Sequence, residues 1–301
     1  MKPSRKYSKP VLLGTLVIST LALVAWSPPT GEDIFVSSGT PAVAIGSANQ
    51  IEGFTHTSTI PADTTAFRGF LAGKSNYVGS GNSNGFAAVI GNSNTANAYS
   101  SVIVGNSNVV ANGATTGTAS LAYSGIFGHG NVIPMNCDTL LVSGTANTVN
   151  GNGSFATGRD NPVEGVSGGL TYHSAAIGQL NHVAAPHGYA IGYANNVFGD
   201  RGVVIGPGSN AGALESVAIG SANDISSSSS YSYALGGGLR VTQPGSLALG
   251  SWNALMVAGD VMVVGCRNST TPATALRVTS NGGVILSRAQ GDISMGIYDA
   301  N

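Results

Sequence analysis

Charge is scarce in this sequence. Lys, Arg, Asp and Glu make up 8% of the 301 residues, and the formal net charge is −1. Charged residues account for about 25% of an average domain. Proteins that bind nucleic acids neutralise phosphate groups with clustered Lys and Arg side chains. The sequence has no such cluster, so its composition gives no support to nucleic-acid binding.

Cysteine is scarce too, because Cys137 and Cys266 are the only two. Two thiols do not make a disulfide framework. If the repeats described below stack into a rod, these two residues lie many coils apart. A disulfide needs Cα atoms within ~7 Å of each other. We therefore expect two separate thiols.

Patterns typical of enzymes and cofactor sites are missing as well. The 13 carboxylates include no closely spaced acid–base pair. Gly-rich pieces such as 206–209 lack the strand–loop–helix setting of phosphate-binding loops. Neither the period of six of acyltransferase β-helices, nor regularly spaced calcium-binding Asp, nor the Thr-x-Thr array of ice-binding solenoids is found. We expect no enzymatic activity, no cofactor and no metal site.

Glycine is abundant, with 44 residues, and much of it belongs to a repeated pentapeptide. Residues 216–220 read S-V-A-I-G, and variants end at Gly178, Gly192 and Gly206, each 14 residues from the next. A fixed period of this kind is typical of a solenoid. The last residue of each pentapeptide is termed the anchor glycine. The anchors are Gly46, Gly73, Gly91, Gly105, Gly128, Gly144, Gly158, Gly178, Gly192, Gly206, Gly220, Gly236, Gly250 and Gly265.

Two further marks follow the anchors. An aliphatic residue usually stands five positions on, and an asparagine stands three positions on, with Ser209 and Leu239 as exceptions. Gly and Asn accept a positive φ at least cost, so we expect both to turn the chain at corners between short strands. Stacked coils would align the asparagine side chains in a hydrogen-bonded ladder. The asparagines are Asn49, Asn76, Asn94, Asn108, Asn131, Asn147, Asn161, Asn181, Asn195, Asn223, Asn253 and Asn268.

The strand of each coil has consecutive apolar residues, such as those at 217–219. Side chains alternate between the two faces of a strand, so both faces are apolar. One face can fill the coil's own interior, and the other needs a cover. We expect other copies of the chain to supply that cover. The isoleucines that precede the anchors in the most regular part are Ile177, Ile191, Ile205 and Ile219.

Departures from the 14-residue period indicate insertions into the coils and the ends of the stack. Extra residues at 111–123, 164–173 and 226–231 are expected to project from one corner of the coils, and a degenerate coil is expected at about 55–65. Insertions on one face of a repeat array often form its binding face.

The period stops near the C-terminus. There two β-type runs flank Asn281-Gly282, which is a strong hairpin signal. We interpret 269–301 as a cap that protects the open edge of the stack.

Residues 1–26 have the layout of a secretory signal. A basic stretch precedes the uncharged apolar run 11–26, which ends near small residues. An uncleaved membrane anchor is the competing interpretation, but the run falls short of the ~20 apolar residues that span a bilayer. We expect export, with 27–39 as a short linker. Any membrane contact would come through an uncleaved signal.

One column of the predicted stack is a candidate binding surface. Equivalent positions of neighbouring coils lie side by side, and five residues before the anchors stand His173, His187, Arg201 and Glu215. Two imidazoles without a nearby carboxylate or thiolate are too few for a metal site. We interpret the column as a solvated polar corner that could contact a ligand.

The S-V-A-I-G and G-x-x-N repeats together resemble the head domain of trimeric autotransporter adhesins, the YadA-like group. The resemblance covers about 40–268, and motif and period coincide. It implies a left-handed parallel β-roll, three chains side by side and an adhesive role. The sequence shows neither the heptad stalk nor the membrane-anchoring segment of that group, so we expect a head without them.

Together these observations predict an all-β protein with β-roll head repeats at 40–268 and a C-terminal hairpin cap. We expect an exported homotrimer, secreted or at the cell surface, that binds host or environmental surfaces through its outer coil faces and corner loops. A periplasmic location is the alternative. A self-assembling extracellular filament or fibre subunit is the alternative function, and a phage-type fibre head is a third.

Overall fold

The computed structural model describes the repeats and part of each end of the chain. The described residues are 33–36, 42–47, 49–51, 68–78, 86–96, 101–110, 124–134, 137, 139–164, 171–253, 255–268 and 271–286. Across these ranges the chain forms strands and turns, and it contains no helix long and apolar enough to cross a membrane. The predicted signal, the degenerate coil at 55–65 and the insertion at 111–123 lie outside the described residues.

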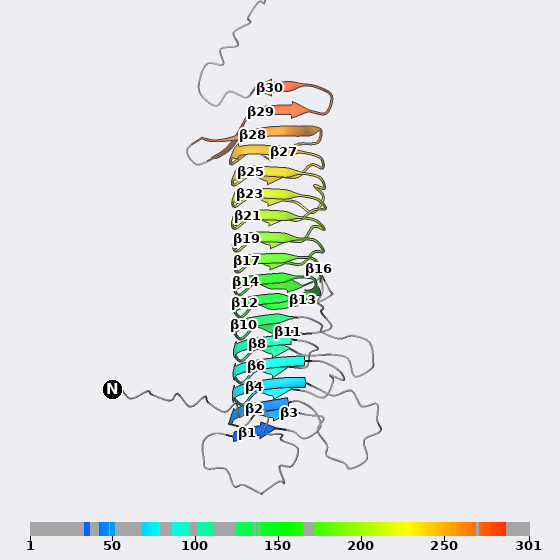
Figure 1. Cartoon of the computed structure of the whole chain (residues 1–301). Coiled ribbons are helices and arrows are strands. Elements are labelled where there is room, and N and C mark those ends of the chain that lie inside the picture. Colours follow the sequence, from blue (N-terminus) through cyan, green and yellow to red (C-terminus); the bar gives the residue numbers. More distant parts are fainter. Residues whose placement is uncertain are drawn as a thin grey trace, which may run out of the picture.

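The strands form a parallel β-solenoid, the fold that the repeat predicts (Figure 1). The first of its two sheets has 17 strands, which pair in parallel apart from those at its two ends. Its strands are β1 (Asp33–Val36), β2 (Ala42–Ser47), β4 (Arg68–Lys74), β6 (Phe86–Asn92), β8 (Ser101–Asn106), β10 (Gly125–His129), β12 (Leu141–Thr145), β14 (Phe155–Arg159), β17 (Ala175–Gln179), β19 (Tyr189–Tyr193), β21 (Val203–Pro207), β23 (Val217–Ser221), β25 (Tyr233–Gly237), β27 (Leu247–Ser251), β28 (Asp260–Asn268), β29 (Thr271–Thr279) and β30 (Val284–Leu286).

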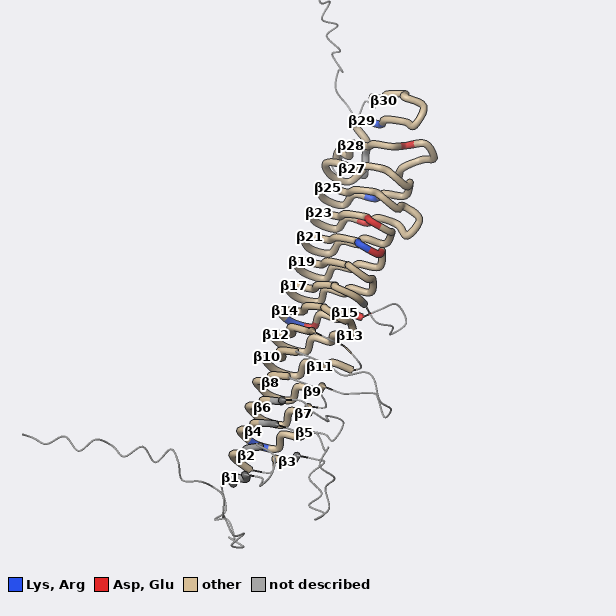
Figure 2. The backbone as a smooth tube through the Cα atoms, turned by 45° about the vertical axis from the view of Figure 1, so that its right-hand side comes forward, with Lys and Arg blue, Asp and Glu red and all other residues tan. Residues whose placement is uncertain are grey.

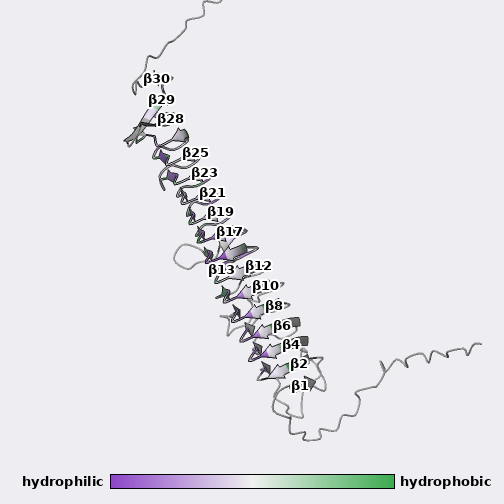
Figure 3. Cartoon of the chain, turned by 90° about the vertical axis from the view of Figure 1, so that its left-hand side faces the viewer, coloured by the Kyte–Doolittle hydropathy of each residue, from purple (hydrophilic) through white to green (hydrophobic). Residues whose placement is uncertain are grey.

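The second sheet has 13 shorter strands, which follow the corner of each coil. They are β3 (Gln50–Ile51), β5 (Tyr77–Val78), β7 (Thr95–Ala96), β9 (Val109–Val110), β11 (Val132–Ile133), β13 (Thr148–Asn152), β15 (Pro162–Glu164), β16 (Thr171–Tyr172), β18 (His182–Val183), β20 (Asn196–Val197), β22 (Asn210–Ala211), β24 (Asp224–Ile225) and β26 (Arg240–Val241). The two sheets run side by side from the coil of β3 to that of β26, and the first sheet alone continues to the C-terminal end (Figures 2 and 3).

The register of the first sheet confirms the repeat. Gly178 lies opposite Gly192, and Ile177 lies opposite Ile191. At the end of the stack Gly250 lies opposite Gly265. Over the whole solenoid a coil takes roughly 15 residues, because several coils carry extra residues in their return segments.

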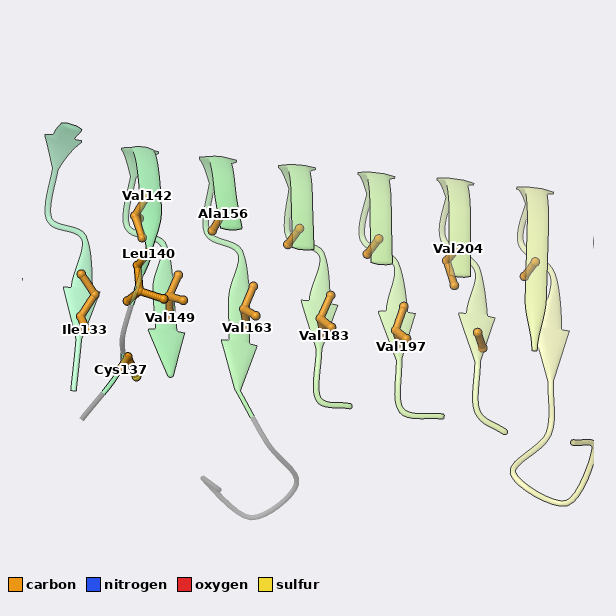
Figure 4. Close-up of a cluster of buried hydrophobic side chains, with 14 of the residues drawn as sticks. Ile133, Cys137, Leu140, Val142, Val149, Ala156, Val163, Val183, Val197 and Val204 are labelled. Atoms are coloured by element: carbon orange, nitrogen blue, oxygen red, sulfur yellow. The ribbon is translucent and has the colours of Figure 1, made fainter. Parts of the chain in front are cut away.

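The core of the solenoid is only two side chains thick. From the anchor Gly73 to the anchor Gly236, each coil directs inward the residue two before its anchor and the residue five after it, such as Ala190 and Val197. Figure 4 shows side chains of this core between the two strands of each coil. In the next coil the pair is Val204 and Ala211, so the larger residue can stand on either strand. All four are fully buried, and each buried Val contributes about 1.5–3 kcal/mol.

The anchor glycines are required by the close approach of neighbouring coils. At Gly206 φ is +128°, and a Cβ built there would lie 2.0 Å from the carbonyl oxygen of Gly220. The same contact recurs at anchor after anchor. Any side chain at these positions would therefore force neighbouring coils apart and strain the backbone.

The asparagines do not themselves turn the chain, so that part of the prediction is wrong. The positive φ belongs to the preceding residue, at 52° in Ala194 and 53° in Ala222, and neither Asn195 nor Asn223 adopts one. The reason is that each asparagine uses both its backbone N–H and its side chain to contact the neighbouring coil. The backbone of Asn195 thus donates to Oδ1 of Asn181 at 3.3 Å.

The asparagine side chains form a buried ladder through the stack. In Asn108, the backbone N–H and Nδ2 both donate to Oδ1 of Asn94, at 3.1 and 3.0 Å. Nδ2 also donates to the carbonyl oxygen of Gly128 at 2.9 Å. Asn131, the next rung, donates to Asn108 in the same way. These asparagines are fully buried, so the ladder satisfies polar groups that water does not reach.

The two exceptions in the asparagine series show what the ladder needs. Ser209 keeps two of its links, because its Oγ donates to Gly220 O at 3.2 Å and accepts from the backbone N–H of Asn223 at 3.0 Å. At Leu239 only the backbone N–H takes part, donating to Asn223 Oδ1 at 3.0 Å. A hydroxyl therefore continues the ladder, and an aliphatic side chain interrupts it.

The last predicted coil is not closed, which corrects the interpretation of Gly265 and Asn268 as corner marks. Gly265 has no positive φ. β28 continues past Gly265, where its pairing with β29 shifts register, to Asn268, which lies opposite Thr271 of the antiparallel β29. The chain therefore turns back within the first sheet and does not cross to the second.

The predicted hairpin is present at the C-terminal end. β29 and β30 pair antiparallel, and Gly282 in the turn between them has a φ of +83°. A buried carboxylate joins the strands on the other side of β29: Asp260 accepts from the backbone N–H of Val257 at 2.7 Å and lies 3.5 Å from Nε of Arg277. At the opposite end of the sheet β1, within the segment predicted as a linker, pairs antiparallel with β2.

Two glycines of one coil should differ sharply in their tolerance of alanine. Gly208 also has a positive φ, but nothing lies within 4 Å of a Cβ built there. Neighbouring coils carry Ala194 and Ala222 at this position. We expect Gly206→Ala to lower the free energy of unfolding by about 3 kcal/mol or more. Gly208→Ala should cost only about 1–2 kcal/mol, the cost of the left-handed conformation alone. Denaturant titration followed by circular dichroism measures both, and equal losses would contradict the close-approach argument.

The ladder predicts a graded series at Asn108. Asn108→Ala leaves the backbone N–H of Asn131 and the carbonyl of Gly128 without a partner, and each such buried group costs about 1–3 kcal/mol. Asn108→Ser should cost distinctly less, because Ser209 shows that a hydroxyl makes both bonds. The same denaturant titration tests this order. A serine variant as unstable as the alanine variant would argue against it.

Candidate interaction surfaces

The outward side chains of the first sheet form one apolar face along the rod. In each coil these are the residues one and three before the anchor, and the name apolar face is used for them below. Ile205 is 39% exposed and Ile219 is 41% exposed, although the residue before each of them on the strand is fully buried. Ile177 belongs to the same column and is half-buried. The large hydrophobic residues exposed on this face are Ile45, Ile90, Val102, Phe127, Leu141, Tyr189, Ile191, Ile205, Ile219, Tyr233 and Leu235.

One pair of hydroxyls interrupts the apolar face. Ser143 of β12 lies opposite Thr157 of β14, in the column that elsewhere holds alanine, valine, isoleucine, leucine or phenylalanine. Their Oγ and Oγ1 atoms are 2.7 Å apart and share a hydrogen bond. Both side chains are half-buried. The next residues in this column are Phe127 on one side and Ile177 on the other.

The outward side chains of the second sheet are polar in the C-terminal half of the rod. Asn210 Nδ2 donates to Asp224 Oδ1 at 2.9 Å, and Asp224 lies 3.9 Å from Nε of Arg240. His182 packs edge-on against Phe198 at a ring distance of 5.4 Å. Figure 2 shows how few charged residues the rod carries. The two long faces of the molecule therefore differ in polarity.

The corner column predicted from the sequence is present. The rings of His173 and His187 stack at a centroid distance of 5.7 Å with planes 16° apart. Arg201 donates from Nη1 to Oε1 of Glu215 at 2.7 Å. His187 Nδ1 also lies 3.3 Å from a carboxylate oxygen of Asp200. The structure thus brings all four predicted residues together in two neighbouring pairs.

The backbone of this column is strained. All four residues have φ between 51° and 55°, a left-handed conformation that costs a residue with a Cβ about 1–2 kcal/mol. Glycine occupies the equivalent position at Gly153 and Gly245. Strained positions that keep large polar side chains where glycine fits are candidates for function.

The column is suited to reversible contacts. Among the described residues no three His, Cys, Asp or Glu side chains are grouped so that they could hold a metal ion. The imidazole, guanidinium and carboxylate groups of the column can donate and accept hydrogen bonds to a polar partner.

The two cysteines lie outside this column. No disulfide joins Cys137 and Cys266: Cys137 is buried, and Cys266 is partly exposed.

Comparison with known proteins does not assign this chain to a family. No family model matches the chain, and no curated protein matches it. The resemblance to adhesin heads therefore stays an interpretation of the repeat motif.

Sequence reasoning missed three functional candidates. The hydroxyl pair at Ser143 and Thr157 could have been noticed as the polar break in a column of apolar residues. Asp200 stands one residue before Arg201, so it belongs to the same corner. Asp260 gave no signal, because its role depends on the antiparallel return of β29.

Arg201→Gly should change the stability little. Glycine relieves the left-handed backbone conformation, and the exposed ion pair that is lost is worth about 0–1 kcal/mol. We expect the free energy of unfolding to change by about 1 kcal/mol or less. In the same coil, Val204→Ala removes buried carbon atoms and should cost about 2 kcal/mol. Thermal and denaturant unfolding compare the two, and a larger loss at Arg201 would assign the column a structural role.

Proposed function

We propose that this protein is an exported, adhesin-like head in which three chains pack side by side through their apolar faces. The observation that carries this proposal is the apolar face of the first sheet, which presents exposed apolar side chains along most of the rod. The repeat motif supports the same interpretation. In this assembly the polar sheet and the corner column remain outside, where they bind host or environmental surfaces without covalent chemistry.

The size of the apolar face supports association. Its parallel strands are spaced about 4.8 Å apart, which gives a length of roughly 60 Å, and the three residues that span its two columns cover about 10 Å of each strand. The product is on the order of 600 Å². That area is at the upper end of the largest apolar patch of a typical monomer, about 300–600 Å², and approaches the ~800 Å² that stable interfaces bury on each partner.

The spacing of the face favours a second copy as the partner. Four successive coils carry isoleucine at the same position, and most other coils carry an apolar residue there. A partner that packs against such rows along their full length must have the same spacing. Another copy of this chain meets that requirement without further assumptions.

A filament subunit is the second candidate, and a different observation favours it. The first sheet ends in β30, whose residues Val284, Ile285 and Leu286 are 63%, 49% and 41% exposed. Its other end is the antiparallel strand β1. Exposed edge strands are templates for pairing with another chain, so end-to-end assembly is the alternative arrangement. Electron microscopy separates the two, because a head gives discrete short rods and a filament gives long polymers.

The assembly is tested by the mass of the purified full chain in light scattering, repeated on dilution. We expect a stable mass of three chains. Ile191→Glu puts a carboxylate on the apolar face and should yield monomers, while the monomer keeps its core. Asn196→Glu lies in the same coil on the polar sheet and should leave the trimer intact. A well-folded monomer in the unmodified chain would contradict the proposal.

Adhesion needs a separate measurement. Beads coated with the protein should be retained on epithelial cell monolayers or on glass more strongly than albumin-coated beads. A variant with glycine at His173, His187, Arg201 and Glu215 should keep its trimeric mass and lose retention if the corner column makes the contact. Retention no better than that of albumin on both surfaces would argue against an adhesive role.

A further inference from the structure

The polarity of the apolar face by itself does not fix how neighbouring copies align along the rod. Ile191, Ile205 and Ile219 stand at equivalent positions of successive coils. In these coils, sliding one copy by a single coil replaces one isoleucine contact with another. Elsewhere the column changes in size but stays apolar, as at Ala72 and Phe127. A slipped register therefore still places apolar side chains against one another over most of the face.

The hydroxyl pair is the feature of this column that breaks the equivalence. Ser143 and Thr157 share one hydrogen bond at 2.7 Å. Two hydroxyls offer two donors and four acceptor positions, so most of their hydrogen-bonding capacity is unused by that bond. Once the face is covered, these groups need polar partners from the covering chain, because a buried hydroxyl without a partner is unfavourable.

Only one alignment supplies those partners. In register, the hydroxyls of each copy meet the hydroxyls of the others. A slip of one coil in one direction places Ser143 opposite Thr157 of the neighbouring copy and Thr157 opposite Ile177. A slip in the other direction places Ser143 opposite Phe127 and Thr157 opposite Ser143. Some of these hydroxyls then face Phe127 or Ile177, whose side chains offer no hydrogen bond. A single polar layer fixes the register of coiled coils for the same reason.

We propose that the Ser143–Thr157 pair sets the register of the side-by-side copies, with all copies aligned coil for coil in the same direction. This inference rests on the proposed trimer and goes beyond it, because it names the residues that select one alignment. The apolar face supplies the association, and the hydroxyl layer selects among alignments that all bury apolar side chains.

The test uses inter-chain disulfides to report which coils of neighbouring copies lie at the same level. Full-length chains carrying Ile205→Cys are mixed during refolding with chains carrying Ile219→Cys, oxidised, and mapped by mass spectrometry, which distinguishes the new pairs from those of Cys137 and Cys266. In-register packing gives 205–205 and 219–219 pairs. A slip of one coil gives 205–219 pairs. We expect like pairs to exceed mixed pairs at least tenfold.

The decisive variant replaces both hydroxyls, as Ser143→Val with Thr157→Val, because Val104 already stands in this column. We expect the trimeric mass to persist and the mixed pairs to rise to within about threefold of the like pairs. Thr148→Val is the matched control, since it removes a hydroxyl from the second sheet in the same region, and it should leave the preference unchanged. Adding Ile177→Ser and Ile191→Thr to the double variant re-creates a hydroxyl pair on adjacent strands and should restore the preference.

The outcomes separate this inference from the proposed function. A trimer that keeps a tenfold preference without the hydroxyls overturns the register role and leaves the trimer standing. A monomeric mass in the unmodified chain overturns the proposed trimer and the register role together. Loss of preference in the Thr148→Val control also overturns the inference, because any lost hydroxyl would then have the same effect.

Discussion

The close contact between neighbouring coils is the constraint on which this structure depends. Adjacent anchors approach so closely that a Cβ on Gly206 would lie 2.0 Å from the next carbonyl oxygen. That spacing lets one asparagine reach the side chain of the coil before it and the carbonyl of the coil after it. Each rung is satisfied only when both neighbours are in place, so stability accumulates between coils more than within any one of them.

A core two side chains thick has a consequence for the surface. Every strand of the first sheet has one face inside and one outside, and the two faces are only a residue apart. The sequence fills both with apolar residues, so the inside column is fully buried and the outside column is exposed in the single chain. In the proposed trimer, the outside column is the surface that further copies would cover.

At the corners, the positive φ and the hydrogen bonds between coils belong to different residues. The anchor glycine and the residue before the asparagine take the positive φ, and the asparagine makes the hydrogen bonds. The third left-handed position carries the His and Arg–Glu column, whose side chains point to solvent at a backbone cost that glycine would avoid. The fold thus concentrates distinctive polar groups at a corner while the strands stay uniform.

The period, all anchors except Gly265 and the hairpin at Asn281-Gly282 could be read from the sequence, because each depends on local spacing and on residue type. Which face of the apolar strand points into the core could not, because both faces are apolar. The column of His173, His187, Arg201 and Glu215 could also be placed, since a fixed period implies which residues become neighbours. Other features needed the tertiary structure. Which residue of a corner takes the positive φ depends on where the asparagine amide must point. The continuation of β28 past Gly265 and the burial of Asp260 arise from antiparallel pairing with β29, a long-range contact that no repeat encodes.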